Sequence, residues 1–219
     1  MTTSNAPLLI WGTGGHAISV LETATAAGET SISFCQERPD SEQFGGFPLV
    51  PARDVYPMLG NYRVVVAIGD NYAREQVVST LIAQQPELAF ATLIHPSAIV
   101  ASSATLGSGS VILQGAVVGA EATIDEHCIM NTRSALDHES HMSRFASLAP
   151  GVTTGGNVYV GAGTAIGIGA CIRHGIHIGR DSVVGSASYV HHDLPDNVVA
   201  YGTPARVIRH RQSGDPYLS

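Results

Sequence analysis

Residues 94–118 read IHPSAIVASSATLGSGSVILQGAVV, and in this stretch an apolar residue returns at every sixth position. The same spacing continues as far as Val190, and Thr154 is the polar exception. The positions in phase are Ile94, Val100, Leu106, Ile112, Val118, Ile124, Met130, Leu136, Met142, Leu148, Thr154, Val160, Ile166, Ile172, Ile178, Val184 and Val190. A fixed period of this kind indicates a repeat architecture, in which each unit buries its apolar side only against its neighbours.

A small side chain usually stands four residues after each apolar position, and glycine often follows the apolar position directly. The small residues include Ala98, Ala104, Ser110, Ala116, Ala122, Cys128, Ser134, Ser140 and Ala146, and the glycines include Gly107, Gly119, Gly161, Gly167, Gly179 and Gly185. Neither the helical period of 3.6 residues nor the strand period of two residues explains a strict period of six residues. The pattern predicts a parallel β-helix whose coils stack at roughly 4.8 Å. Parallel crossovers are normally right-handed, so the period alone does not give the hand.

The chain before residue 94 has a different pattern. Strand-like and helical segments alternate there, at residues 8–11, 17–27, 32–35, 51–59, 64–68, 72–83 and 90–94. Such alternation predicts a small parallel α/β domain. We therefore predict an α/β domain over 1–93, the β-helix over 94–193 and a C-terminal cap or tail over 194–219.

The composition favours a small-molecule ligand over a nucleic acid. The 219 residues carry a formal charge of −7 with only 11 Lys and Arg, whereas phosphate backbones are bound by clustered cations. The start of the chain lacks the basic and apolar runs of a signal peptide, and no window has the length of a membrane span. We expect a cytoplasmic protein without a membrane partner, whose three distant cysteines are reduced, packed residues.

A glycine-rich turn follows the first predicted strand and opens the first helix. It reads Gly12-Thr13-Gly14-Gly15-His16-Ala17, a pattern that lets a backbone and a helix N-terminus approach a phosphate. Glu37 stands about twenty positions further along the chain, where a dinucleotide fold places its ribose contact. NAD binding is therefore one interpretation of this turn. This Rossmann-like unit is short for two mononucleotide halves, which counts against NAD. A tight turn without a ligand is a further alternative.

Asp137-His138-Glu139 forms a turn between two inward positions of the repeat. A histidine titrates near neutral pH and can take a proton from an attacking amine or hydroxyl, and a neighbouring carboxylate can fix its tautomer. By spacing alone, a solvated turn histidine is the favoured interpretation.

The whole set of motifs resembles the sialic-acid and bacillosamine type of sugar O- and N-acetyltransferases, which are hexapeptide-repeat, left-handed β-helix acyltransferases. The segments that carry the resemblance are Gly12-Thr13-Gly14-Gly15-His16, Ala67-Ile68-Gly69-Asp70-Asn71, His95-Pro96-Ser97-Ala98, Asn131-Thr132, Asp137-His138-Glu139, Pro150-Gly151 and Gly202-Thr203-Pro204-Ala205-Arg206. The resemblance covers nearly the whole chain and implies a left-handed helix. It also implies a homotrimer with its active sites between the chains.

The resemblance further implies roles for particular residues. His138 is the expected general base, Asp137 or Glu139 tunes it, and Asn131 lies near the acceptor. The expected contacts of a nucleotide-linked sugar are Gly14, Gly15, His16, Gln36, Glu37 and Gly69, and those of acetyl-CoA are Ser147, Gly156, Ile168 and Arg206. Ser147 departs from the family pattern, because such enzymes often carry a second histidine there, and His141 is a nearby substitute. Arg206 and Arg209 are candidates for the CoA phosphates.

The expected activity is acetyl-CoA-dependent N-acetylation of a nucleotide-linked amino sugar for surface glycan synthesis. O-acetylation of a sugar and a non-catalytic nucleotide-sugar-binding scaffold are the alternatives. No catalytic metal is expected, because His138 and His174 would lie two coils, roughly 10 Å, apart and no carboxylate cluster completes a site.

Overall fold

The computed structural model describes residues 6–217, so the outermost ends of the first and last predicted domains, 1–5 and 218–219, lie outside it. The N-terminal part is a six-stranded sheet in the order β3-β4-β2-β1-β5-β6. Its strands are β1 (Leu8–Trp11), β2 (Ile32–Gln36), β3 (Gln43–Phe44), β4 (Phe47–Pro51), β5 (Arg63–Val66) and β6 (Ala89–Phe90). All pairs are parallel except the β3/β4 hairpin. The central strand β1 is buried throughout, as its unbroken apolar sequence requires.

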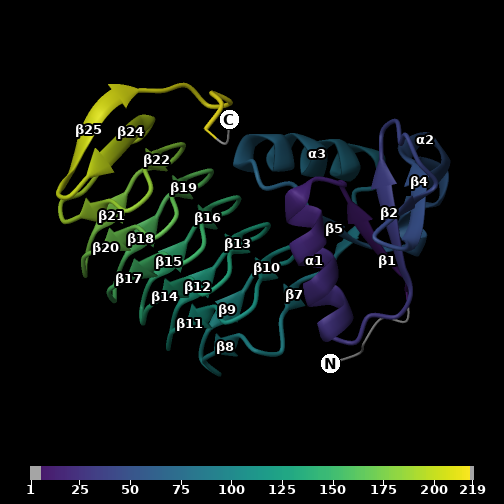
Figure 1. The fold of residues 1–219 in the computed structure, drawn as a ribbon, viewed down its shortest axis with the longest axis horizontal. Helices are drawn as coiled ribbons and strands as arrows, with labels where there is room; N and C mark the ends of the chain where they lie inside the picture. The colour runs from purple at the N-terminus through teal and green to yellow at the C-terminus, as the bar shows by residue number, and fades with distance from the viewer. Residues whose placement is uncertain (1–5, 218–219) are drawn as a thin grey trace.

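Helices cover both faces of this sheet (Figure 1). Helix α1 (Gly15–Ala26) packs on one face, where Ala17 and Val20 join a core with Ile10 and with Val111 of the β-helix. Helix α3 (Asn71–Gln84), the short α2 (Ala52–Val55) and a 3₁₀ segment (Tyr56–Asn61) cover the other face. Helix α1 is therefore held between the N-terminal sheet and the repeat region.

The hexapeptide region forms a rod with three flat sides. Its strands are β7 (Leu93–Ile94), β8 (Ile99–Val100), β9 (Thr105–Leu106), β10 (Val111–Ile112), β11 (Val117–Val118), β12 (Thr123–Ile124), β13 (Ile129–Met130), β14 (Ala135–Leu136), β15 (His141–Met142), β16 (Ser147–Leu148), β17 (Thr153–Thr154), β18 (Tyr159–Val160), β19 (Ala165–Ile166), β20 (Cys171–Ile172), β21 (His177–Ile178), β22 (Val183–Val184) and β23 (Tyr189–Val190). Every third strand pairs in parallel at a register of eighteen residues, as in Val111↔Ile129. These repetitive parallel strands are typical of a left-handed β-helix, and they confirm the predicted fold class.

We name the three sides by their strands. The first rod sheet contains β7, β10, β13, β16, β19 and β22, the second runs from β8 to β23, and the third from β9 to β21. The apolar member of the repeat fills the interior, where Ile124, Leu136 and Val160 are fully buried. The N-terminal domain covers the first coils of the first rod sheet, where Val111 and Ile129 are buried although they point outward.

The small and glycine positions of the repeat have separate structural reasons. Buried hydroxyls join successive coils, as where Ser110 Oγ donates to Asp125 O and accepts from Cys128 N. A glycine after the apolar residue lets the next coil approach, because a Cβ at Gly107 would lie 2.4 Å from the Asp125 backbone. The six-residue period therefore reflects side-chain packing and backbone contact between coils together.

Several predicted elements differ in detail from the structure. The strand predicted over 90–94 is two strands, since β6 belongs to the N-terminal sheet and β7 to the rod. The helix predicted over 51–59 is a short α-helix followed by a 3₁₀ turn, because Pro57 lacks the N–H that an α-helix needs. The expectation of three packed cysteines is wrong for Cys171, which is exposed on the second rod sheet, while Cys35 and Cys128 are buried.

The C-terminal region continues the first rod sheet instead of leaving it. Strands β24 (Val198–Gly202) and β25 (Ala205–His210) form an antiparallel hairpin whose turn contains a cis Thr203–Pro204 bond. β24 pairs with β22, so the hairpin closes the end of the rod. The division of the chain near residues 93 and 193 stays a prediction.

Candidate active site

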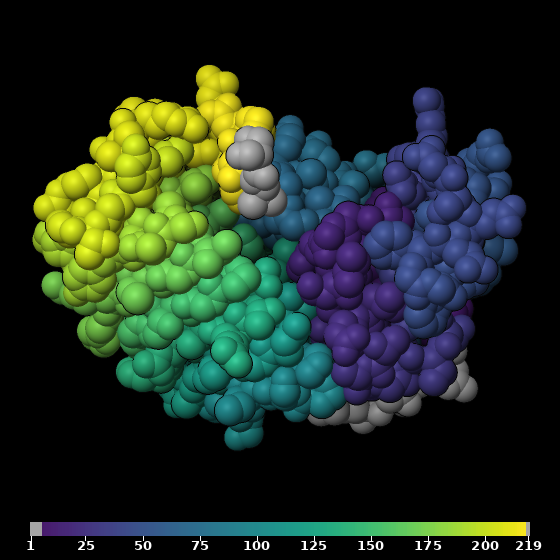
Figure 2. Space-filling model, viewed as in Figure 1, coloured from purple at the N-terminus to yellow at the C-terminus, as the bar shows by residue number. Residues whose placement is uncertain are grey.

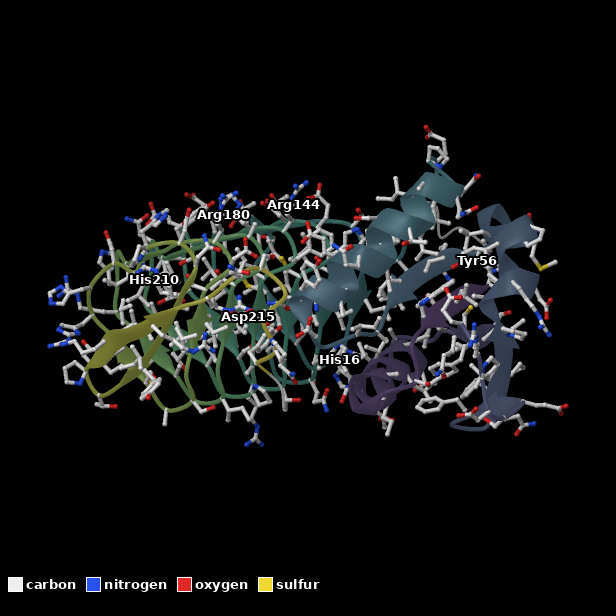
Figure 3. All side chains as sticks on the ribbon, turned by 90° about the horizontal axis from the view of Figure 1, so that it is seen from above. His16, Tyr56, Arg144, Arg180, His210 and Asp215 are labelled. Atoms are coloured by element: carbon white, nitrogen blue, oxygen red, sulfur yellow. The ribbon has the colours of Figure 1, made fainter. Side chains whose placement is uncertain are left out.

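A cleft of about 640 Å³ lies where the N-terminal domain meets the rod. One wall comes from the start of α1 and the loop before α3, with Gly15, His16, Ser19 and Gly69. The other wall is the first rod sheet, which contributes Asn131, Ser147 and the largely apolar stretches 148–150, 165–168 and 183–186. Figure 3 shows His16 where the purple helix α1 meets the rod. The cleft has the size of a small-molecule site.

The glycine turn gives this wall an open backbone. Gly12 has φ +113°, and a Cβ there would lie 3.1 Å from Ala67 O, so the turn itself requires glycine. At Gly14 and Gly15 a Cβ would meet nothing within 4 Å, so packing does not explain those two glycines. Gly14 caps α1 without a side-chain hydrogen bond, and Ala17 N donates to Gly14 O, which leaves the N–H groups of Gly15 and His16 available to a ligand.

His16 is an uncharged polar group in the cleft wall. Burial and the Arg74 guanidinium lower its pKa to about 4, so the ring is neutral at pH 7. Its Nε2 is buried and has no hydrogen-bond partner among the residues that the structure describes. A buried nitrogen of this kind needs a partner, and a ligand in the cleft can supply one.

Arg74 fixes the loop that carries Gly69. Its side chain is 1% exposed, and Nη1 donates to Ile68 O at 2.9 Å. Nε donates to His127 O at 2.9 Å and Nη2 to Phe145 O at 2.8 Å, both of which belong to the rod. One buried guanidinium thus holds the two walls of the cleft at a fixed distance.

The His138 turn lies at the corner between the second and third rod sheets, between β14 and β15. Glu139 Oε2 lies 3.0 Å from His138 Nδ1, and the imidazole side chain is 49% exposed. Asp137 instead receives the backbone N–H of His138 on Oδ1 at 2.7 Å. Glu139 therefore orients the ring, and Asp137 braces the turn.

Neighbouring coils shape the space around this turn. A Cβ at Gly119 would lie 2.6 Å from His138 N, and a Cβ at Gly156 would lie 2.3 Å from His138 Cε1. Thr154, the polar exception in the repeat, accepts the Asp137 N–H on its Oγ1 at 3.0 Å. At the equivalent place in other coils the acceptor is a backbone carbonyl, as where Asn131 N donates to Leu148 O. The irregularity of the sequence thus marks a local change in the ladder under His138.

The structure brings only some of the predicted site residues together. Gly15, His16, Gly69, Asn131, Ser147 and Ile168 line the one cleft, whereas none of the described residues lining it comes from the turn 137–139. Gly156 lies against His138, and Asn131, expected beside that base, lies in the cleft instead.

Gln36, Glu37 and Arg206 are not among the residues that line this cleft. Gln36 accepts from Thr13 Oγ1 at 2.5 Å, and Glu37 accepts from the Tyr56 hydroxyl at 2.7 Å. Burial first, and then Glu37, raise the pKa of Tyr56 to about 12. Arg206 lies exposed on β25, with Nη1 donating to Ala205 O at 3.0 Å, and Arg209 lies 3.7 Å from Asp215. Sequence reasoning missed Tyr217, which the C-terminal segment brings into the cleft without any motif to mark it.

Within residues 6–217, no group of three or more His, Cys, Asp or Glu side chains is arranged to hold a metal ion. None of the helices described in that range is long and apolar enough to cross a membrane.

Residues 7–81 match the family model of the PglD N-terminal domain. The acetyltransferase domain of PglB from Neisseria gonorrhoeae FA1090, in complex with acetyl coenzyme A, is 32% identical with a TM-score of 0.88. That comparison covers 94% of this chain and 100% of the other. PerB from Caulobacter crescentus, in complex with CoA and GDP-perosamine, is 33% identical with a TM-score of 0.85, over 94% of this chain and 99% of the other. The chain belongs to the hexapeptide-repeat sugar acetyltransferase family of the PglD and PerB type.

Membership in this acetyltransferase family rests on similarity over 94% of this chain, whereas the curated relatives match only a short segment of it. The galactoside O-acetyltransferases of Lactococcus lactis and Escherichia coli K12 are 43% and 41% identical over 58 and 66 residues. Those segments are 26% and 30% of this chain and 28% and 30% of the relatives. WeeI from Acinetobacter baumannii AYE, at 20% identity and a TM-score of 0.85, shares the fold.

Proposed function

We propose that this protein transfers the acetyl group of acetyl-CoA to the amino group of a nucleotide-linked amino sugar. The observation that carries the proposal is the cleft, in which the open glycine turn and His16 face a mostly apolar strip of the rod. The first wall suits a nucleotide sugar, because it offers helix N–H groups and a neutral imidazole to phosphate and sugar oxygens. The second suits the long, weakly polar pantetheine arm of CoA.

His138 is the proposed general base. The amine nitrogen attacks the thioester carbonyl carbon and loses a proton to the imidazole, which Glu139 orients through Nδ1. The C–S bond then breaks, and the CoA sulfur leaves with that proton as a free thiol. The products are the sugar acetamide and CoA.

One chain does not bring His138 to the cleft, so the complete site requires a second chain. The second rod sheet has an exposed apolar face, with Ile99 66% exposed and Tyr189 38% exposed, on which copies of the chain can pack. We propose a homotrimer of about 68 kDa, three times the 22.8 kDa chain, with one copy's His138 entering the next copy's cleft. Light scattering at micromolar concentration measures the mass, and a monomer contradicts this assembly.

Free-thiol release from acetyl-CoA tests the activity. With a panel of UDP-, dTDP- and GDP-linked amino sugars, we expect at least one acceptor to release thiol at a rate that depends on its amino group. His138→Asn should lower turnover roughly 10²- to 10⁴-fold while the assembly is retained. An enzyme that accepts none of the amino sugars contradicts the proposal.

O-acetylation is the second candidate, favoured by the similarity of a segment of this chain to galactoside O-acetyltransferases. The same base would then deprotonate a hydroxyl. Replacing each amino sugar by its hydroxyl counterpart in the assay separates the two activities, because only the O-acetyltransferase keeps its rate.

A further inference from the structure

The C-terminal segment after β25 is tied to the rod and returns toward the N-terminal domain. Figure 1 shows the yellow segment after β25 running to the beginning of α3, and Figure 2 shows this segment against the blue-green surface there. Arg211 is 8% exposed and donates from Nη1 to Asp181 O and from Nη2 to Asp215 O, each at 2.6 Å. The Asp215 carboxylate in turn accepts from Gln212 N at 3.0 Å. These bonds give the segment a defined course up to Tyr217.

Tyr217 joins the two walls of the cleft. Its hydroxyl oxygen accepts the backbone N–H of Asn71, at the start of α3, at 2.9 Å. The Ser147 side chain, on the first rod sheet, lies near the same phenol. Both Tyr217 and Ser147 line the cleft. The Arg211 guanidinium lies 5.8 Å from the centre of the Tyr217 ring and supports it from the segment itself.

The hydrogen bond that this phenol accepts leaves its O–H donor unused. A tyrosine hydroxyl has two acceptor sites and one donor. Burial raises the pKa of Tyr217, while the Asn71 N–H opposes the shift by donating to the phenol oxygen. The Asn71 N–H occupies one acceptor site and the phenol keeps its proton at neutral pH, so its O–H is available as a donor at the cleft.

The surroundings of Ser147 indicate which substrate this donor meets. Along the rod wall, Ser147 lies between Ile129 and Ala165, and Val183 lies beyond Ala165; these three side chains have no polar atoms. A diphosphate or a sugar has many oxygens and would leave most of them unpaired on such a wall, at a cost for each group. The acyl-pantetheine arm of CoA has isolated amide and thioester carbonyls on an otherwise weakly polar chain. One phenol donor on an apolar strip matches that chemistry.

We propose that Tyr217, delivered by the C-terminal segment, binds the acyl donor by donating its O–H to a carbonyl oxygen of the acyl-pantetheine arm. This inference rests on the proposed function, because it takes acetyl-CoA as the ligand of the rod wall. It assigns the C-terminal segment a role in the site, beyond closing the end of the fold.

Tyr217→Phe tests the proposal, since it removes the hydroxyl and keeps the ring over Arg211. We expect the acetyl-CoA dissociation constant in calorimetry to rise about three- to tenfold, the value of one neutral hydrogen bond, with the nucleotide-sugar constant unchanged. Tyr62→Phe is the matched control, because the Tyr62 hydroxyl contacts Met58 Sδ at 3.8 Å, away from the cleft, and should leave both constants unchanged. Ser147→Ala should also raise the acetyl-CoA dissociation constant. In the double variant the effects of the two substitutions should be less than additive.

The outcomes separate this inference from the proposed function. Unchanged acetyl-CoA affinity in Tyr217→Phe, even with a lower melting temperature, means that the hydroxyl only pins the segment to Asn71, and it overturns the inference alone. If Tyr217→Phe binds the nucleotide sugar more weakly and acetyl-CoA with unchanged affinity, that result also overturns the inference. Wild-type protein that binds acetyl-CoA but acetylates no amino sugar overturns the proposed acceptor while the Tyr217 result still stands. Wild-type protein that does not bind acetyl-CoA overturns both.

Discussion

At the scale of single residues, the candidate base depends on neighbours that touch it from three sides. Glu139 contacts the ring of His138, Asp137 holds its backbone N–H, and Gly156 leaves room for the imidazole. The first two were visible in the sequence as a turn with two carboxylates. Their separate roles were not, because the choice between them depends on side-chain rotamers that no spacing specifies.

The two carboxylates beside His138 should have unequal effects. Glu139→Gln removes the charge that faces the Nδ1–H, and we expect kcat/KM to fall about tenfold, the exposed site limiting the effect. Asp137→Asn keeps an oxygen that can accept the His138 N–H, so its rate should stay within about threefold of wild type. Steady-state thiol release measures both, and a larger loss in Asp137→Asn contradicts the assignment of Glu139.

Gly156→Ala should move the base without unfolding the rod. Gly156 has no left-handed φ, so alanine is compatible with its backbone, but the new Cβ would lie 2.4 Å from His138 Nε2. The ring must swing away, and we expect turnover to fall roughly 10- to 100-fold with an unchanged melting temperature. In a His138→Asn background, Gly156→Ala should not lower turnover further, because Gly156 acts through the imidazole. A full additional loss in the double variant would assign Gly156 another role.

At the scale of elements, the repeat predicted nearly every short strand of the rod, because a buried apolar position every six residues admits one arrangement of strand and turn. The α/β elements were predicted less well. Pro57 breaks the predicted helix, and residues 90–94 divide between two sheets because Ala91 and Thr92 separate β6 from β7. The C-terminal hairpin and the placement of Tyr217 lay outside any repeat, so only contacts distant in the sequence define them.

Thr154→Val tests whether the polar exception supports the His138 turn. Valine matches the shape of threonine but cannot accept the Asp137 N–H, so that group loses its bond or the turn moves to the regular carbonyl ladder. We expect a loss of about 1 kcal/mol in the free energy of unfolding together with a several-fold fall in turnover. Thr153→Val is the control, since Thr153 is exposed on the outer face of the same strand. Turnover equal to wild type in Thr154→Val would show that the hydroxyl serves packing alone.

At the scale of the whole molecule, the two parts meet through a charged group with no carboxylate partner among the described residues. Arg74 is buried at the junction and bonds carbonyls of the rod at His127 and Phe145. His127 itself stacks on the Phe145 ring at 5.1 Å and meets the edge of Phe90. The change from alternating strands and helices to the six-residue repeat placed the predicted boundary near residue 94, but the sequence did not show that a fixed cation makes the interface intolerant of a second positive charge.

The junction should therefore weaken in acid. Burial first, and then the Arg74 charge, lower the pKa of His127 to about 4 from the ordinary value of 6.5, and His16 is shifted in the same direction. Between those two pH values the unfolded chain binds a proton that the folded chain excludes, so the free energy of unfolding falls as the pH falls. Each such histidine contributes at most about 1.4 kcal/mol per pH unit, beginning near pH 6.5 and ending near pH 4.

His127→Asn tests this acid sensitivity. Asparagine tolerates the left-handed φ of 57° at this position and cannot titrate, so the free energy of unfolding of the variant in urea should depend less steeply on pH than that of wild type. His210→Asn replaces an exposed histidine and should keep the wild-type slope, whereas equal slopes in His127→Asn and wild type would mean that another group controls the acid sensitivity of the junction.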